Sequence, residues 1–159
     1  MGQLLVEGGE PERNLQRACE MVCEAKEKKC ELILLPECLD LVWSHPSAKT
    51  KAEPIPGPFS DVLCKEAAKQ SIYIVAGLTE KSGNKVYNSS VFINPKGEII
   101  LKYRKINILT VVQDIYSIGD SLSVVDTPFG KVGIDICSDN YIDALHIGHT
   151  LARMGAQVI

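Results

Sequence analysis

A cysteine follows an apolar, β-branched stretch of the chain, in a position that suits a nucleophile. Residues 131–136 predict a strand, Cys137 comes next, and the small polar residues after it predict the start of a helix. A thiol between a strand end and a helix N-terminus has a lowered pKa, because the positive end of the helix dipole favours the thiolate. The alternative is a structural cysteine that ends the strand, since free cysteine is among the most buried residue types.

Two other reactive side chains also follow predicted strands. Glu37 comes shortly after the apolar run 32–35, and Lys105 follows the strand predicted at 98–103. Ligands bind at the carboxyl ends of strands in open α/β sheets, so these groups and Cys137 are expected to meet there. The carboxylate would take the thiol proton, the thiolate would attack an electrophilic carbon, and the ammonium would stabilise the negative charge that develops. Taken singly, Glu37 is equally a turn residue and Lys105 part of a solvated basic face.

Three short motifs carry a family resemblance. The segments 34–37 (LLPE), 103–107 (YRKIN) and 133–139 (GIDICSD) resemble the glutamate, lysine and nucleophile motifs of the nitrilase superfamily of carbon–nitrogen hydrolases, in the same order and over essentially the whole chain. The resemblance implies an α/β fold, an α-β-β-α sandwich that pairs with a second subunit through its outer helices. It also implies a Glu-Lys-Cys triad that uses no metal and no organic cofactor.

The resemblance assigns a role to each of these side chains. Cys137 would form a thioester or thioimidate, Glu37 would be the general base that later activates water, and Lys105 would stabilise the tetrahedral intermediate. The backbone N–H of Ser138 would add an oxyanion donor. The residues expected to line the pocket directly after the nucleophile are Ser138, Asp139 and Asn140.

The chain departs from the family pattern in two places. Many members carry a second glutamate between the lysine and cysteine motifs, and here Asp114 is the only acid between Lys105 and Gly119. Either this aspartate substitutes or the role is absent. After the cysteine, many relatives carry Tyr-Asp-x-Arg-Phe, whereas this chain has residues 138–141 (SDNY). The substrate class therefore stays open among an amide, an N-carbamoyl amine and a nitrile.

Composition limits the kinds of partner. The 159 residues are 45% hydrophobic and 23% charged, which is ordinary for one globular domain. A net charge of −3 lacks the basic excess typical of nucleic-acid binding, and no apolar run approaches the roughly 20 residues of a membrane helix. None of the six cysteines forms a C-x-x-C pair, so a zinc site has no support. We expect a cytoplasmic homo-oligomer that acts on a small molecule.

Alternating helices and strands must position the reactive groups. Apolar residues at spacings of three and four predict a helix over 12–29, and Ser60 is a suitable cap for a second helix to 70. A long surface loop is expected at 40–58, and loop with one helical turn at 108–121. A third helix is expected from Asp139 or Asn140 to about Met154, with Gly155 after its end. The predicted strands are 32–35, 72–78, 86–93, 98–103, 122–125 and 131–136.

The sequence pattern at both chain ends indicates strands that are interrupted. Residues 157–159 begin a strand, and the first residues look like the tail of another. We therefore expect one carbon–nitrogen hydrolase domain over 1–159 that is partial, truncated at its C-terminus and at its N-terminus. Such a chain would leave a sheet edge uncovered and would hydrolyse amides poorly or not at all by itself.

Three functional hypotheses remain at this point. The first is a thiol hydrolase that cleaves a non-peptide carbon–nitrogen bond through a Cys-bound acyl intermediate. The second is a nitrilase-fold binding or assembly protein whose catalysis is impaired or lost. The third is an acyltransferase that uses the same triad. Selective alkylation of Cys137 favours an enzyme, whereas uniform slow labelling of all six thiols favours the binding protein.

Overall fold

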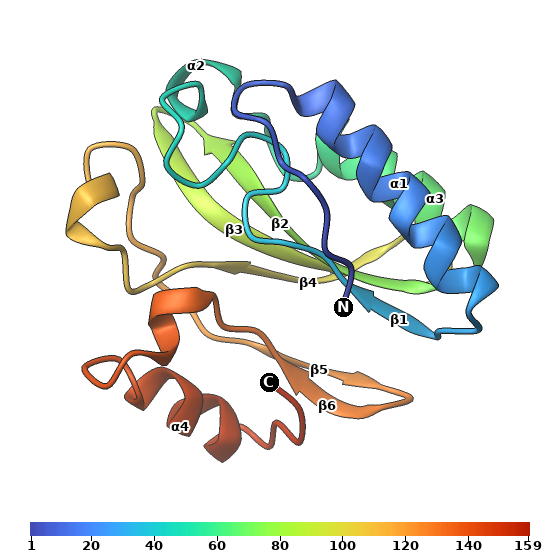
Figure 1. Cartoon of the computed structure of the whole chain (residues 1–159). Coiled ribbons are helices and arrows are strands. Elements are labelled where there is room, and N and C mark those ends of the chain that lie inside the picture. Colours follow the sequence, from blue (N-terminus) through green and yellow to red (C-terminus); the bar gives the residue numbers. More distant parts are fainter.

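Two sheets lie between layers of helices (Figure 1). A computed structural model describes residues 1–159. Helices α1 (Pro11–Glu27) and α3 (Pro58–Gln70) cover the outer face of a four-stranded sheet, and the inner face of that sheet turns toward a two-stranded sheet. Helix α4 (His146–Arg153) covers the far side of the smaller sheet. The order of layers confirms the predicted α-β-β-α arrangement.

The strands of the larger sheet follow chain order. They are β1 (Leu32–Leu34), β2 (Tyr73–Ser82), β3 (Lys85–Ile93) and β4 (Ile99–Arg104). Strand β1 runs parallel to β2 because α3 carries the chain back across the sheet, and the other pairs are antiparallel hairpins. The smaller sheet pairs β5 (Val124–Thr127) with β6 (Gly130–Gly133).

Strand alternation divides the apolar residues between two cores. On β2, Ile74, Ala76 and Leu78 face α1 and α3, and they belong to a buried cluster of 15 residues. The opposite face of the same sheet supplies Val75 and Phe92, which join Val132, Ile134 and Ile136 in a second cluster of 7 buried residues. The second cluster holds the two sheets together, and the reactive groups lie beside it.

Several predicted elements need correction in their bounds. Helix α3 begins at Pro58 rather than Ser60, because Gly57 is the N-cap and Ser60 bonds its backbone from inside the first turn. The predicted surface loop 40–58 contains the short helix α2 (Ala48–Lys51), and its residue Leu41 is fully buried.

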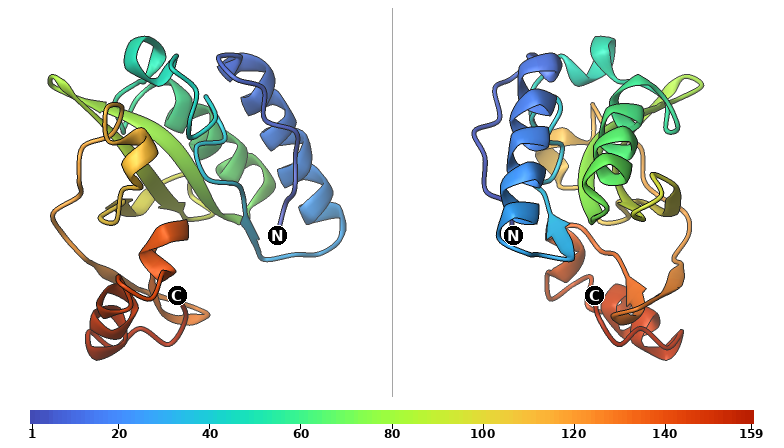
Figure 2. Two further views of the ribbon diagram at one scale, coloured as in Figure 1. Left: turned by 60° about the vertical axis from the view of Figure 1, so that its left-hand side comes forward. Right: turned by 90° about the vertical axis from the view of Figure 1, so that its right-hand side faces the viewer.

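The N-terminal segment differs from the expectation, whereas the C-terminal segment pairs as expected. The N-terminal segment forms no strand, because its backbone makes a single hydrogen bond to β1, from Gly2 to Leu34. At the other end, Val158 forms an isolated parallel bridge with Val132 of β6, as the predicted strand at 157–159 requires. Figure 2 shows the N-terminus beside the larger sheet and the C-terminus beside the smaller one.

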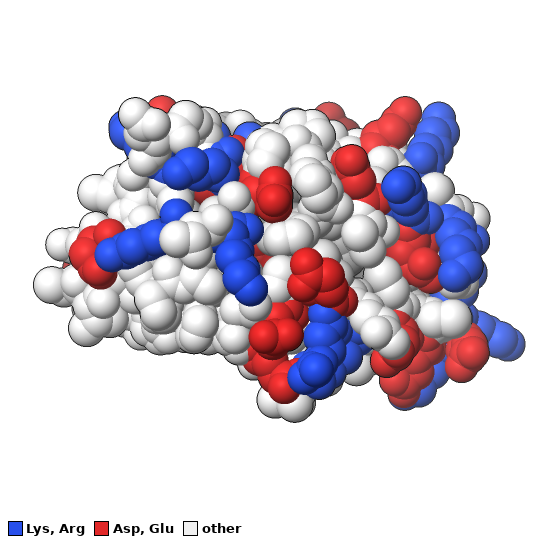
Figure 3. Space-filling model, turned by 90° about the horizontal axis from the view of Figure 1, so that it is seen from above, with Lys and Arg blue, Asp and Glu red and all other residues white.

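None of the helices combines the length and the apolar character that a membrane span needs. The face that Figure 3 shows, over the outer helices, carries Lys and Arg interspersed with Asp and Glu. Ion pairs between neighbouring side chains, such as Arg13 with Glu7 at 3.2 Å, account for part of this mixing. This face therefore lacks the continuous basic stripe that nucleic-acid binding requires.

The helix predicted after Cys137 ends where expected, but its predicted start at Asp139 or Asn140 is wrong. A single 3₁₀ turn, η2 (Cys137–Asn140), follows β6, and α4 starts only at His146. Cys137 itself has φ 49°, in the left-handed region that residues with a side chain rarely adopt. Such strain persists only where surrounding contacts hold the backbone in place, and it is concentrated at functional sites.

This conformation predicts an inverted order of stability for two substitutions. Cys137→Gly should be more stable to urea than Cys137→Ala by about 1 kcal/mol, because glycine adopts positive φ without steric strain. At Cys64, inside α3, the order should be the usual one, with alanine more stable than glycine by about 1 kcal/mol. Equal stability of the two variants at position 137 would mean that the residue is not strained.

Candidate active site

The turn after β1 places Glu37 over the sheet. The backbone of β2 passes directly beneath it, since a Cβ on Gly77 would lie 2.6 Å from the Glu37 Cα. Gly77 N–H donates to the Pro36 carbonyl at 3.1 Å, and the Leu39 N–H donates to the Gly77 carbonyl at 2.9 Å. The chain can therefore approach this closely only because position 77 has no side chain.

A buried carboxylate anchors the same turn. Asp40 accepts hydrogen bonds from the Thr79 N–H at 2.9 Å, the Thr79 hydroxyl at 3.0 Å and the Leu41 N–H at 2.9 Å. Burial raises the pKa of Asp40 to about 6, although these hydrogen bonds favour its ionised form. Asp40 thereby joins the Glu37 turn to the end of β2.

Lys105 follows β4 and reaches Glu37 across the sheet. Its Nζ donates to Glu37 Oε1 at 2.8 Å, and its backbone N–H donates to the Asn88 carbonyl at 2.8 Å. The side chain of Lys105 is 4% exposed and that of Glu37 is 22% exposed, so the pair is shielded on the side of the lysine. The structure thus brings together two of the three side chains that the sequence singled out.

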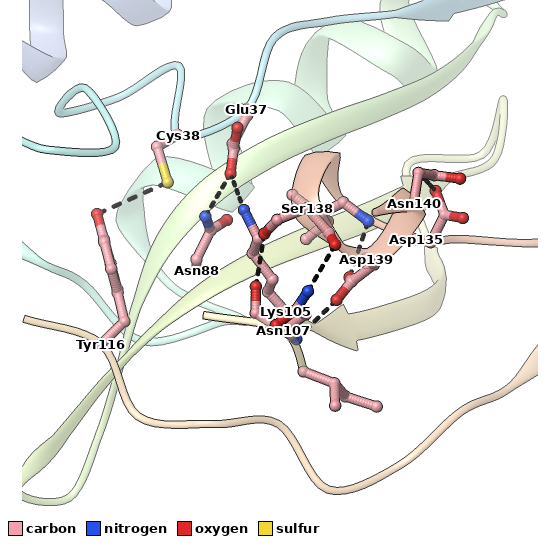
Figure 4. Close-up of polar contacts among 12 residues, drawn as sticks. Glu37, Cys38, Asn88, Lys105, Asn107, Tyr116, Asp135, Ser138, Asp139 and Asn140 are labelled. Carbon is pink, nitrogen blue, oxygen red and sulfur yellow. Dashed lines mark hydrogen bonds and ion pairs between the residues drawn. The ribbon is translucent and has the colours of Figure 1, made fainter. Parts of the chain in front are cut away.

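Asn88 completes this cluster, and the sequence interpretation missed it. Its Nδ2 donates to Glu37 Oε1 at 2.6 Å (Figure 4). The strand alternation of β3 puts Asn88 on the inner face of the sheet, where the neighbouring positions Val86, Ser90 and Phe92 are also buried. A polar amide at an inward position of a predicted strand was the available signal.

The thiol of Cys137 lies at a cleft between the two sheets. The cavity has a volume of about 350 Å³, opens to solvent, and is lined mostly by apolar side chains. Glu37 and Cys137 both contribute to its wall, and Ser90 and Asp135 are its other polar members. The cleft is where a small molecule can reach the thiol.

The expectation of a lowered thiol pKa is wrong. Partial burial and the negative charge of Glu37 raise the pKa of Cys137, and they outweigh the Lys105 ammonium and the Ser138 N–H, which both lower it. No α-helix begins at the cysteine, so the helix dipole that the sequence suggested is absent. The resting thiol is therefore protonated at neutral pH, and its activation needs a base.

The residues after Cys137 fasten its turn to the loop that carries Lys105. Asp139 accepts the Tyr103 hydroxyl at 2.7 Å, the Asn107 N–H at 2.7 Å and the Ile136 N–H at 3.0 Å. Ser138 donates its hydroxyl to the Asn107 carbonyl at 2.6 Å, and the Asn107 amide donates to the Ser138 carbonyl at 2.7 Å. Both side chains are buried, so they hold the strained turn from behind (Figure 4).

The remaining expected site residues lie at the surface. Asn140 is exposed and donates to Asp135 at 2.8 Å. Asp114 is also exposed and pairs with Lys49 at 2.7 Å, which lowers its pKa. Neither residue has a hydrogen bond or ion pair with the Glu37–Lys105 pair. No group of three or more His, Cys, Asp or Glu side chains is arranged to hold a metal ion.

Comparisons with known proteins identify the family. The carbon-nitrogen hydrolase model matches residues 3–159. The omega-amidase NIT2-A of Xenopus laevis is 33% identical over 156 residues, which are 92% of this chain and 56% of that protein. A nitrilase of Pyrococcus abyssi is 36% identical over 155 residues, 94% of this chain and 58% of its own.

A solved structure agrees with the sequence relatives. Nit3 of Saccharomyces cerevisiae, a member of branch 10 of the nitrilase superfamily, superposes with a TM-score of 0.86 at 28% identity, over 98% of this chain and 60% of that one. The chain thus spans a little over half the length of the relatives it matches, and its layers are those of the nitrilase fold. On these grounds the chain belongs to the carbon-nitrogen hydrolase family, within the nitrilase superfamily.

Proposed function

We propose that Cys137, Glu37 and Lys105 hydrolyse the carbon–nitrogen bond of a small amide through an acyl-cysteine intermediate. The observation that carries the proposal is the shielded Glu37–Lys105 ion pair beside a thiol at an open cleft. A carboxylate within reach of a protonated thiol is a general base, and an ammonium beside it stabilises an oxyanion.

In the acylation half-reaction, the Cys137 thiol gives its proton to the Glu37 carboxylate. The sulfur attacks the substrate carbonyl carbon, and the electron pair of the C=O bond moves to its oxygen, where Lys105 and the Ser138 N–H stabilise the negative charge. When the C–N bond breaks, Glu37 returns the proton to the departing nitrogen. The products of this half are an amine or ammonia and a thioester on Cys137.

Deacylation repeats the same steps with water. Glu37 takes a proton from water, the resulting hydroxide attacks the thioester carbon, and the C–S bond breaks. The proton then returns to the sulfur, so the acid leaves and the free thiol is regenerated. With an amide, Glu37 thus moves a proton in both halves, whereas the thiol attacks only in the first. An activated ester, whose leaving group departs as an anion, needs Glu37 chiefly in the second half.

The relatives favour an amide among the three substrate classes that the sequence left open. Proteins named omega-amidases match most of this chain at 31–34% identity, and a nitrilase matches it at 36%. The cleft wall has no lysine or arginine, so a neutral acyl group fits it best. An acyltransferase would share the acyl-cysteine step and differ only in giving the acyl group to an amine.

One observation favours a second function, that of a binding or assembly protein with weakened chemistry. Asp114, the only acid available to replace the second family glutamate, pairs with Lys49 at the surface. The site therefore lacks a second carboxylate from this segment. If such a carboxylate is indispensable, Cys137 will bind but not turn over its substrate, and the experiments below separate the two functions.

The charges around the thiol predict that substitutions of Glu37 and Lys105 change the alkylation rate of Cys137 in opposite directions. Glu37→Gln should speed the alkylation of Cys137 by iodoacetamide at pH 7.5 roughly tenfold, because removing the negative charge lowers the thiol pKa and so raises the thiolate fraction. Lys105→Met should slow it. Mass spectrometry of each cysteine gives the rates, with the exposed Cys30 as the internal reference. Equal rates in all three proteins would contradict the proposed arrangement.

Acyl transfer can be tested separately from alkylation. The wild-type chain should accept the acetyl group of p-nitrophenyl acetate on Cys137 and then release it, because Glu37 activates water. In Glu37→Gln the acetyl group should accumulate at that cysteine, with hydrolysis slowed at least about a hundredfold, the usual contribution of a general base. Intact-mass spectrometry over time, with Cys137→Ala as the control, gives both rates. Equal loss of the adduct from both proteins would remove Glu37 from deacylation.

We also propose that the chain pairs with a second copy through its outer helical layer. Tyr141, Ile142 and Leu145 lie together just before α4, and Ile142 is 89% exposed. Exposed apolar side chains in a group mark an association surface. Ile142→Glu with Leu145→Glu should convert a dimer to a monomer in analytical ultracentrifugation, and circular dichroism at low temperature should show that the variant keeps its fold. A wild-type chain that stays monomeric at all concentrations would refute this pairing.

A further inference from the structure

Asn88 combines a short hydrogen bond with an unpaired polar atom. Its side chain is 2% exposed, and its Nδ2 lies 2.6 Å from Glu37 Oε1. Its Oδ1 is the one buried side-chain nitrogen or oxygen in the chain that lacks a hydrogen-bond partner. A buried acceptor without a partner destabilises a fold, so a residue that keeps one needs another explanation.

The chemistry of Glu37 fixes the orientation of the amide. An ionised carboxylate only accepts hydrogen bonds, so Asn88 must turn its NH₂ group toward Glu37 and its carbonyl oxygen away. The bond to Glu37 and the unpaired Oδ1 are therefore two consequences of one contact. A residue that served the stability of β3 alone would have no reason to keep this arrangement.

The contact also distinguishes the two oxygens of Glu37. Oε1 accepts from Lys105 Nζ at 2.8 Å and from Asn88 Nδ2 at 2.6 Å, whereas Oε2 accepts no hydrogen bond within the protein. The two donors come from neighbouring strands, because the Lys105 N–H bonds the Asn88 carbonyl. Together they hold the carboxylate by one oxygen and leave the other free.

We propose that Asn88 is a positioning residue that holds Glu37 by Oε1 so that Oε2 faces the Cys137 thiol. This inference rests on the proposed function, in which Glu37 takes the thiol proton. The charged and titratable groups around the thiol are Glu37 and Lys105 across the cleft, and Asp135 and Asp139 on its own segment. Asn88 adds no charge, so it affects the thiol only by fixing the position of the Glu37 carboxylate.

Four proteins test this inference: the wild type, Asn88→Leu, Glu37→Gln and the double variant. Leucine has the shape of asparagine but donates no hydrogen bond. Without the amide, Glu37 should move from the thiol, the thiol pKa should fall, and alkylation of Cys137 by iodoacetamide at pH 7.5 should rise roughly threefold. In the Glu37→Gln background, Asn88→Leu should leave the alkylation rate of Cys137 unchanged, because there is no carboxylate left for Asn88 to position.

Two further readouts separate positioning from a structural role. The melting temperature of Asn88→Leu should be equal to or higher than that of the wild type, because the unpaired acceptor is removed. The fully buried Cys38 should stay unlabelled in every variant. A lower melting temperature, labelling of Cys38 or an effect that adds to that of Glu37→Gln would make Asn88 structural and overturn the inference.

The experiment also separates this inference from the function on which it rests. If Glu37→Gln speeds the alkylation of Cys137 and Asn88→Leu matches the wild type, the inference fails and the proposed function stands. If Glu37→Gln leaves the rate unchanged, Glu37 does not face the thiol, and both fail.

Discussion

The ion pair between Glu37 and Lys105 is the interaction on which the site depends. Burying two charges costs free energy unless geometry and further hydrogen bonds compensate for the lost water. Here the carboxylate receives a second donor from Asn88, and the turn that carries it is anchored to β2 through Asp40. Removing either charge would leave the other without its opposite charge in a shielded place. The pair therefore joins the segments that follow β1 and β4.

We propose that the thiol depends for its reactivity on this pair and not on its own segment. Cys137 lies in a strained turn that Asp139 and Ser138 fasten to the lysine loop. Burial and the charge of Glu37 keep the thiol protonated, while the same carboxylate is within reach of its proton. In the mechanism that we propose, the sulfur is neutral at rest and is activated at the moment of attack, when Glu37 takes its proton.

Residues at strand ends could be predicted because the signal is local. Glu37, Lys105 and Cys137 each follow an apolar run, and the structure places the first two in contact and the third beside them at the cleft. Asn88 could not be predicted in the same way. Its role depends on the register of β3 against β4, which pairs it with Lys105, and no short segment encodes that register.

The start of the helix after Cys137 was predicted wrongly for a related reason. Asp139 is a good helix cap by type, but its carboxylate bonds Tyr103 and Asn107 from an earlier part of the chain. These tertiary contacts hold residues 137–140 in a 3₁₀ turn and delay the helix to His146. Without a helix at the cysteine, no helix dipole lowers the thiol pKa. Burial and the charge of Glu37 raise it instead.

A direct titration of the Cys137 thiol tests whether the Glu37 carboxylate raises its pKa. Carbon-13 NMR of Cβ-labelled cysteine, with Cys137→Ala to assign the signal, follows the thiol through its ionisation. We expect a midpoint above the ordinary cysteine value in the wild type and a lower midpoint in Glu37→Gln. A wild-type midpoint below the ordinary value that Glu37→Gln leaves unchanged would contradict this expectation.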